Sequence, residues 1–214
     1  MLGLKTMTRF AIWWTAGLTL VLVAACAPTP VETPPPSALS EAQVSALVAA
    51  GVRKGALETA VGAYARHARA VRAPRYLTLV DFARRSTEER MAIIDLNTGT
   101  AEQFLVAHGQ GSDPDHDGYA DRFSNIMNSR MSSLGAFVTA ETYIGENGLS
   151  LRLDGLEPRN NLARARAIVV HGADYVAPGQ SVLGRSWGCP VIEPQYVDRV
   201  LPQLAGGSFL YIAN

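Results

Sequence analysis

The sequence predicts a mainly β fold with flanking helices, an α+β domain, and three patterns support this. After Pro74 the apolar residues follow the period of two that strands show, in residues 76–82 and again in residues 91–96. Residues 97–100, Asn-Thr-Gly-Thr, give a hairpin-turn signal before a third strand at residues 102–108. Before Pro74 the apolar residues recur at helical spacing, so a helical segment leads into the β-rich part.

The helical lead-in spans residues 40–73 and is expected to contain two helices. Ser40, with Gln43 three residues later, fits a capping box at the start of the first helix. Two glycines then interrupt the apolar pattern, and a second helix is expected over residues 56–72.

The β-rich part, residues 74–214, contains further expected strands and one helix. These strands lie at residues 135–143, 149–153, 167–171 and 208–212. The helix covers residues 196–204 and ends at the Gly206-Gly207 pair. The 214 residues suit one domain plus a targeting segment.

Residues 1–25 have the composition of an export signal. A positive start is followed by an apolar run over residues 10–25, which is too short to span a bilayer comfortably. Small residues precede Cys26 as in the bacterial lipobox, where the chain is cut before the cysteine and the cysteine then carries lipid. The alternatives are a plain signal peptide cleaved nearby and a membrane anchor.

Residues 26–39 are predicted to be an extended tether, because they contain five prolines among small polar residues. Ala27 after the cysteine resembles outer-membrane sorting in enteric bacteria. We therefore expect an exported, periplasmic protein anchored by lipid to a membrane, with the outer membrane favoured.

The overall charge gives no sign of a nucleic-acid partner. The chain has 19 Lys and Arg residues against 19 Asp and Glu residues, so its formal charge is zero. Binding to nucleic acid needs a basic face that releases counterions, and a neutral balance does not indicate one.

The chain has only two cysteines, Cys26 and Cys189. If Cys26 carries lipid, Cys189 has no disulfide partner, and an unpaired thiol in an exported protein is a candidate reactive group. The alternative is a buried structural cysteine, because free cysteine is among the most buried residue types.

The candidate site combines Cys189 with His171. The thiolate is the nucleophilic form of cysteine, and a histidine can take the thiol proton and pass it to a leaving amine. His171 closes the apolar strand at residues 167–170, which can hold its side chain rigidly. Gly188 removes side-chain bulk just before the nucleophile, so that backbone N–H groups can approach a developing oxyanion.

The spacing of these residues resembles a known family signature. Fourteen residues, 172–185, separate His171 from Ser186. The arrangement of His171-Gly172 followed at this spacing by Ser186-x-Gly188-Cys189 is similar to the signature of the YkuD-type L,D-transpeptidases. The wider sequence over residues 75–213 resembles the murein L,D-transpeptidase catalytic-domain group. The segments that carry this likeness are residues 76–82, 94–96, 106–109, 123–125, 132–135 and 150–156.

The resemblance implies a β-sandwich catalytic fold and a reaction on peptidoglycan stem peptides. Cys189 would be acylated by a stem tetrapeptide with loss of its terminal D-alanine, and an amine of a neighbouring stem would then take the acyl group. With water as acceptor the outcome is L,D-carboxypeptidase activity. The Gly172 carbonyl would orient His171, and Arg185 and Ser186 would shape the pocket. No metal or organic cofactor is implied, and carbapenem-type inhibitors are expected to acylate the cysteine.

Two positions depart from the family pattern. Trp187 stands where the family usually has a histidine, and Val191 stands where it usually has Asn or Arg. These departures put the acceptor and the details of substrate binding in doubt.

An aspartate-rich segment follows the third strand. Its spacing resembles a calcium loop, with a glycine at the sixth position, but Ser124 stands at the twelfth position in place of Glu. The candidate ligands are Asp113, Asp115, Asp117 and Asp121. A solvated acidic loop is the favoured alternative. A zinc site at His108 and His116 lacks the matching ligand spacing.

Three other functions agree less well with the sequence than the family resemblance does. NlpC-type peptidases place the cysteine before the histidine, whereas here His171 comes first. Sortases use an arginine after the cysteine, and the one downstream arginine, Arg199, is expected on a helix. A non-catalytic wall-binding lipoprotein is the rival from another class, and the presence of both Cys189 and His171 argues against it.

Overall fold

Two helices open the part of the chain that the structure, a computed structural model, describes, residues 39–214. Helix α1 (Glu41–Ala49) begins at the predicted capping box, in which Ser40 and Gln43 satisfy each other's backbone N–H groups. Helix α2 (Lys54–His67) follows. The predicted export signal, Cys26 and the tether up to residue 38 lie outside the described residues.

Helix α2 ends earlier than residue 72, where the sequence placed its end. A short 3-10 helix, η1 (Ala68–Ala70), follows His67. The N–H groups of Arg72 and Ala73 then donate to the Gly207 carbonyl, at 3.0 and 3.1 Å. This contact with a distant loop replaces the hydrogen bonds that would continue the helix.

Eight strands make up the rest of the regular structure, with one further helix. Their bounds are β1 (Tyr76–Asp81), β2 (Glu89–Asp95), β3 (Thr100–Ala107), β4 (Gly135–Gly145), β5 (Gly148–Gly155), β6 (Val169–Gly172), β7 (Val191–Ile192) and β8 (Phe209–Ala213). Between β7 and β8 lie the 3-10 helix η2 (Pro194–Tyr196) and helix α3 (Val197–Leu204). The prediction of a mainly β domain with a few helices is confirmed, and β7 is the strand that the sequence did not predict.

The strands close into a single barrel in the order β1-β2-β3-β7-β6-β5-β4-β8. The predicted β-sandwich is therefore wrong in its sheet arrangement. Strand β8 pairs in parallel with β1 and antiparallel with β4, so it joins the two ends of the sheet. Strand β7 pairs with β3 and with β6, so it joins strands β1–β3 to strands β4–β6 and completes the barrel.

One hydrophobic core fills the barrel. Its residues come from inward-facing strand positions, such as Val80, Phe137 and Leu151, and are fully buried. Helix α3 contributes Val200 and Leu204 to the same core. Burial of such side chains stabilises the fold by about 1.5–3 kcal/mol each.

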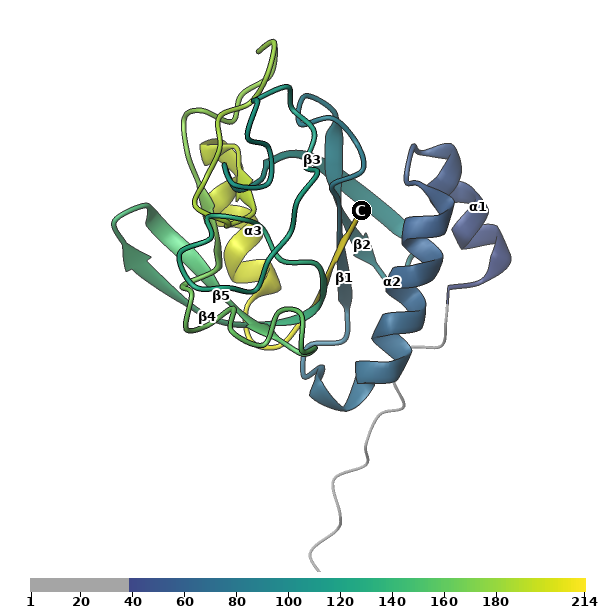
Figure 1. Cartoon of the computed structure of the whole chain (residues 1–214). Coiled ribbons are helices and arrows are strands. Elements are labelled where there is room, and N and C mark those ends of the chain that lie inside the picture. The colour runs from purple at the N-terminus through teal and green to yellow at the C-terminus, as the bar shows by residue number, and fades with distance from the viewer. Residues whose placement is uncertain (1–38) are drawn as a thin grey trace, which may run out of the picture. The chain divides into compact units, whose positions relative to one another are not determined.

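A second core lies between the helical lead-in and the outside of the barrel. Leu77, Leu79 and Phe209 point outward from β1 and β8 and pack against Leu57 and Ala60 of α2. Strand β1 is therefore covered on both faces, which explains why nearly all its residues are buried. Figure 1 shows α2 lying alongside β1 and β2, with α1 outside it.

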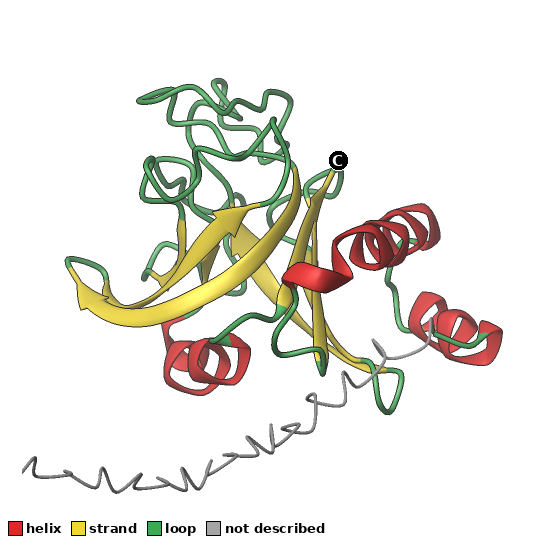
Figure 2. Cartoon of the chain, turned by 90° about the horizontal axis from the view of Figure 1, so that it is seen from below, coloured by secondary structure: helices red, strands yellow, loops and turns green. Residues whose placement is uncertain are grey.

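Long loops connect the strands around the candidate site. Residues 108–134 form one long connection between β3 and β4, and residues 173–190 form another between β6 and β7. Figure 2 shows the long loops gathered together at one end of the strands. Within residues 39–214 no helix is long and apolar enough to cross a membrane.

Candidate active site

Parallel pairing of β6 and β7 brings the two sequence-predicted residues to the same part of the barrel. His171 is in register with Val191, which lies two residues after Cys189. Cys189 precedes β7 by two residues, so this pairing brings the segment that carries it next to β6. The segments that carry His171 and Cys189 are thus adjacent in the fold.

His171 is held as a neutral imidazole with a defined tautomer. It is almost fully buried, and its Nδ1 lies 3.0 Å from the Gly172 carbonyl oxygen. A carbonyl can only accept, so Nδ1 carries the hydrogen and Nε2 keeps its lone pair. Burial lowers the pKa of His171, against a smaller opposing effect of the Gly172 hydrogen bond. The side chain is therefore ready to accept a proton at Nε2.

Cys189 is held as a thiol. Its Sγ donates to the Ala167 carbonyl at 3.6 Å, and burial raises its pKa. The Val169 N–H and the positive charge of Arg166 act in the opposite direction by stabilising the thiolate. Ala167 has a φ of 54°, a left-handed conformation that costs a non-glycine residue about 1–2 kcal/mol. Deprotonation of this thiol needs a base close by.

Ser186 fixes the backbone on both sides of Cys189. Its Oγ donates to the Cys189 carbonyl at 2.7 Å and accepts from the Gly188 N–H at 3.0 Å. The Ser186 N–H donates to the His108 carbonyl at 2.9 Å, which ties the loop to the end of β3. Ser186 is buried and acts on the shape of the site through these bonds.

Gly188 is required by space and by backbone conformation. Its φ is 123°, and a Cβ at this position would lie 2.7 Å from the Met131 carbonyl oxygen. Its N–H is bonded to Ser186, so close packing is the role that its contacts support. A part for Gly188 in an oxyanion site stays a prediction.

Arg185 contacts the aspartate-rich loop. Its guanidinium donates to the Asp113 backbone carbonyl. It therefore links the loop before Cys189 to residues 113–118, and its predicted role in shaping a substrate pocket stays a prediction.

Sequence reasoning missed a buried polar chain beneath the Cys189 loop. Arg90 donates to His108 Nδ1 at 2.7 Å, and His108 Nε2 lies 3.1 Å from Asp113 Oδ2. All three side chains are at most 2% exposed. Because arginine can only donate, the hydrogen of His108 is on Nε2 and points to the carboxylate. No local pattern marks Arg90, since its partners are far away in the sequence.

Electrostatic effects keep the hydrogen-bonded residues Arg90, His108 and Asp113 in one protonation state. Burial lowers the pKa of His108 to about 4, with help from the nearby Arg90 charge. Burial also lowers the pKa of Arg90 to about 9, which leaves it charged at neutral pH. The pKa of Asp113 is lowered because hydrogen bonds from His108 and Gly118 outweigh the effect of its burial. A charged Arg90 and Asp113 thus flank a neutral histidine.

The two histidines that the sequence analysis rejected as zinc ligands are used in other contacts. His108 is enclosed by Arg90 and Asp113, as described above, and His116 Nε2 lies 2.9 Å from the Leu183 carbonyl. The ring nitrogens of His108 and His116 take part in these separate contacts, so the two histidines do not form a shared metal site.

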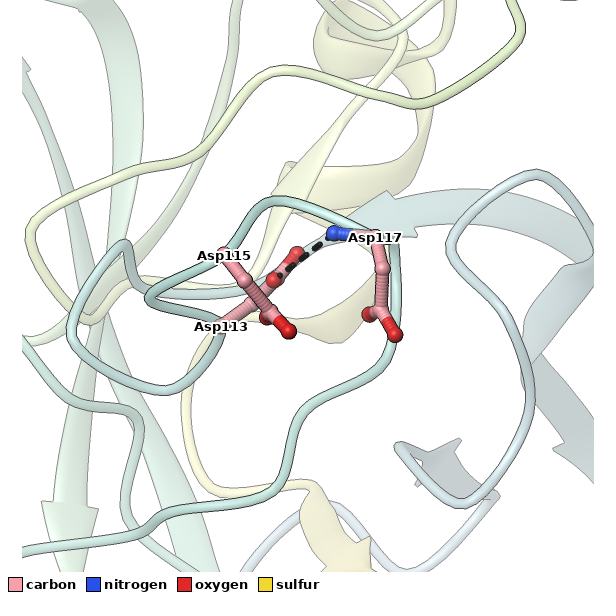
Figure 3. Close-up of side chains that lie close together, drawn as sticks. All are labelled: Asp113, Asp115 and Asp117. Atoms are coloured by element: carbon pink, nitrogen blue, oxygen red, sulfur yellow. Dashed lines mark hydrogen bonds between the residues drawn. The ribbon is translucent and has the colours of Figure 1, made fainter.

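The aspartate-rich loop brings together three of its four predicted calcium ligands. One oxygen each of Asp113, Asp115 and Asp117 lies within 4.8 Å of the others, as Figure 3 shows for their side chains. The Asp113 oxygens already accept from His108 and from the N–H groups of Asp117 and Gly118. Asp121 is not part of the group. Hydrogen bonds within the loop agree with the favoured reading of a solvated acidic loop, and calcium binding stays an untested alternative.

The fold and the site together describe a barrel domain with His171 on β6 and Cys189 two residues before the neighbouring strand β7. A sequence profile of the L,D-transpeptidase catalytic domain matches residues 48–213. The chain therefore belongs to the L,D-transpeptidase catalytic-domain family. Among curated proteins, none matches this chain.

Solved structures of L,D-transpeptidases are similar to this chain at low identity. One from Mycobacterium smegmatis has 12% identity and a TM-score of 0.42, over 65% of this chain and 59% of that one. One from Mycobacterium tuberculosis H37Rv has 9% identity and a TM-score of 0.44, over 65% and 58%. L,D-transpeptidase 3 from Mycobacterium tuberculosis, in complex with a faropenem-derived adduct, has 8% identity and a TM-score of 0.42, over 65% and 60%. The chain spans about three fifths of the length of these proteins.

Proposed function

We propose that this protein is a peptidoglycan L,D-transpeptidase in which Cys189 is the nucleophile and His171 is its base. One observation carries the proposal: His171 Nδ1 is held by the Gly172 carbonyl, on a strand paired in parallel with the strand that Cys189 enters. Membership of the family gives this pair its reaction class.

In the first half-reaction the cysteine takes an acyl group from a stem tetrapeptide. His171 Nε2 accepts the Sγ proton, and the thiolate attacks the carbonyl carbon of the third residue. A thioester forms and the C–N bond to the terminal D-alanine breaks. The imidazolium then returns the proton to the departing amine, as a general acid does.

In the second half-reaction the acyl group passes to an acceptor. An amine of a neighbouring stem attacks the thioester, His171 takes the amine proton and returns it to sulfur, and a link between two third-position residues results. If water attacks instead, the product is a tripeptide and the activity is that of an L,D-carboxypeptidase. The acceptor therefore decides between the two outcomes.

We further propose that the protein acts in the periplasm, tethered to a membrane through lipid on Cys26. The support is the sequence of residues 1–26, an export signal followed by a lipobox-like cysteine. Cys26→Ala is expected to move the protein from the membrane fraction to the soluble periplasmic fraction. Unchanged membrane association of that variant would contradict the lipid anchor.

Mass spectrometry of the products tests the reaction. The purified full chain is incubated with disaccharide-tetrapeptides, with Cys189→Ala as the matched control. A cross-linked dimer that lacks one D-alanine supports transpeptidation, whereas tripeptide alone supports the carboxypeptidase. If the wild type gives neither product and Cys189 does not react with thiol reagents, the protein is a non-catalytic wall-binding lipoprotein. Carbapenems are expected to add their mass to the wild type and not to Cys189→Ala.

A further inference from the structure

A cavity of about 250 Å³ lies beside the loop that carries Cys189, and it is lined by Met127, Asn128, Arg130, Arg166 and Trp187. Trp187 lies two residues before Cys189 in the chain. Arg166 directly precedes Ala167, whose carbonyl accepts from the thiol. The cavity is therefore bounded by residues on both chain segments that contact the nucleophile.

The charge of this cavity is positive and uncompensated. Its lining includes two arginines and no carboxylate. Within residues 39–214, neither Arg130 nor Arg166 forms a salt bridge. A guanidinium without a counter-ion next to a reactive group favours an anionic ligand.

Arg166 is held rigidly by neutral acceptors. Its Nη1 donates to the Ser124 carbonyl at 2.6 Å and to Ser133 Oγ at 2.5 Å. Its Nη2 donates to Ser129 Oγ at 3.1 Å and to the Met131 carbonyl at 2.6 Å. These bonds fix the guanidinium in place but leave its charge, which opposes the larger effect of burial on the pKa of the Cys189 thiol.

Arg130 lies over the face of an exposed aromatic ring. Its Cζ is 4.8 Å from the ring centroid of Trp187, a side chain that is 70% exposed. Asn128 and Arg130 have φ values of 59° and 54°, left-handed conformations that cost about 1–2 kcal/mol each. Strain of this kind persists at functional sites, where the surrounding structure imposes it. Trp187, which stands where the family usually has histidine, thus holds an arginine without a salt bridge against the loop that carries Cys189.

We propose that this cavity is an anion subsite that binds the terminal carboxylate of the donor peptide, with Arg130 as the direct contact. The inference rests on the proposed function, because the donor tetrapeptide ends in a D-alanine with a free carboxylate. Only the amide nitrogen and one Cα separate this carboxylate from the scissile carbonyl carbon. When that carbonyl reaches Cys189, the carboxylate must therefore lie close to the sulfur. The charge of Arg166 acts on this sulfur, and Arg166 shares its cavity with Arg130.

Two donor substrates that differ in one charge test the subsite in the full chain. One is the disaccharide-tetrapeptide, and the other is its C-terminal amide, in which D-alaninamide replaces D-alanine. We expect wild-type kcat/KM to be about ten- to hundredfold higher for the acid, the range for a hydrogen bond to a charged group. Arg130→Gln should lose this preference by lowering kcat/KM for the acid alone, and Arg130→Lys should recover part of it.

Arg69→Gln is the matched control, because Arg69 is an exposed arginine in η1 that lines no part of the cavity. It should keep the wild-type preference for the acid. Equal turnover of both donors by the wild type, or an equal loss on both donors in Arg130→Gln, overturns the subsite and leaves the proposed function standing. Release of D-alanine or D-alaninamide from neither donor by the wild type overturns both.

Discussion

The two reactive side chains are uncharged in the resting protein, and burial is the common cause. Burial raises the pKa of the Cys189 thiol and lowers the pKa of the His171 imidazole. A stable thiolate–imidazolium pair would require both shifts to have the opposite sign. In the proposed mechanism His171 therefore acts as a base during the attack, and not as the counter-ion of a thiolate formed beforehand.

This charge state predicts the pH dependence of Cys189 reactivity. Alkylation by iodoacetamide should keep rising above pH 8.5, about the ordinary pKa of a thiol, because burial raises the pKa of Cys189. The acidic fall of kcat/KM should lie below about pH 6.5, because a lowered pKa keeps His171 neutral to lower pH. Mass spectrometry of the peptide that contains Cys189 separates this thiol from Cys26. An alkylation rate that is already constant below pH 7 would contradict the neutral pair.

Gly188 gives a test of how tightly the nucleophile loop is packed. Gly188→Ala must place a Cβ 2.7 Å from the Met131 carbonyl oxygen in a backbone conformation that alanine disfavours. We expect a loss of about 2 kcal/mol or more in unfolding free energy and a large loss of activity. Urea denaturation measures the first and D-alanine release the second. Gly179→Ala is the control for backbone strain alone, because Gly179 also has a positive φ of 81° but has open space around it.

The buried His108 predicts a stability change with pH. In the unfolded chain its pKa is about 6.5, whereas in the folded protein it is about 4. Between these values the unfolded state binds more protons, so lowering the pH destabilises the fold, by up to about 3 kcal/mol. His171 adds to the same trend because burial also lowers its pKa. His108→Gln should melt at lower temperature but with a weaker dependence on pH between 6.5 and 4; an unchanged slope would exclude His108 as the source.

At the scale of residues, candidate site residues that lie at a fixed spacing in the sequence could be predicted. Hydrogen-bond partners that only folding brings together could not. His171 and Cys189 were singled out because their spacing resembles a family signature, and in the structure this spacing corresponds to strand β6, the connecting loop and the approach to β7. Arg90 and Arg166 were missed, since an arginine carries no sequence signal for burial or for the carbonyl groups it will meet. Their roles depend on contacts between segments that lie far apart in the chain.

At the scale of elements, strand β7 explains both the site and the limit of the sequence analysis. It has only two residues, Val191 and Ile192, too few to show a period of two. Yet it pairs with β3 on one side and β6 on the other, which places Cys189 beside β6. The longer strands were predicted because their apolar or alternating patterns extend over enough residues to be recognised in the sequence.

Helix α2 is attached to the barrel by an ion pair that can be tested. Arg53, the residue that precedes α2, donates from Nε and Nη2 to the two oxygens of the buried Asp81, both at 2.7 Å. Arg53→Ala leaves this carboxylate without its main partner, and we expect a loss of about 1–3 kcal/mol in unfolding free energy. Arg75→Ala, which removes an ion pair from the more exposed Asp95, is the control and should lose less than about 1 kcal/mol. Equal losses in the two variants would contradict a special role for the Arg53 pair.

At the scale of the whole molecule, barrel closure is the feature that local patterns could not reveal. Alternation identifies strands but does not say which strand lies beside which. The last strand, β8, lies between the first strand, β1, and β4, and all these contacts join residues far apart in the sequence. A sandwich and a barrel built from the same strands have the same alternation, so only the pairing of β7 and β8 distinguishes them.

The shared core between helices and barrel predicts that residues 74–214 do not form a stable domain alone. Helices α1 and α2 cover Leu77, Leu79, Ile94 and Phe209 on the outside of the sheet. Without residues 1–73 these side chains face water, where each exposed apolar side chain removes about 1.5–3 kcal/mol of burial free energy. Their sum is comparable to the whole stability of an ordinary domain. A chain beginning at residue 74 should therefore aggregate or melt without cooperativity in calorimetry, whereas a chain beginning at residue 39 should melt cooperatively. A soluble 74–214 fragment that melts cooperatively would contradict this prediction. It would show that the barrel is stable without the helices, even with the apolar outer face of its sheet exposed to water.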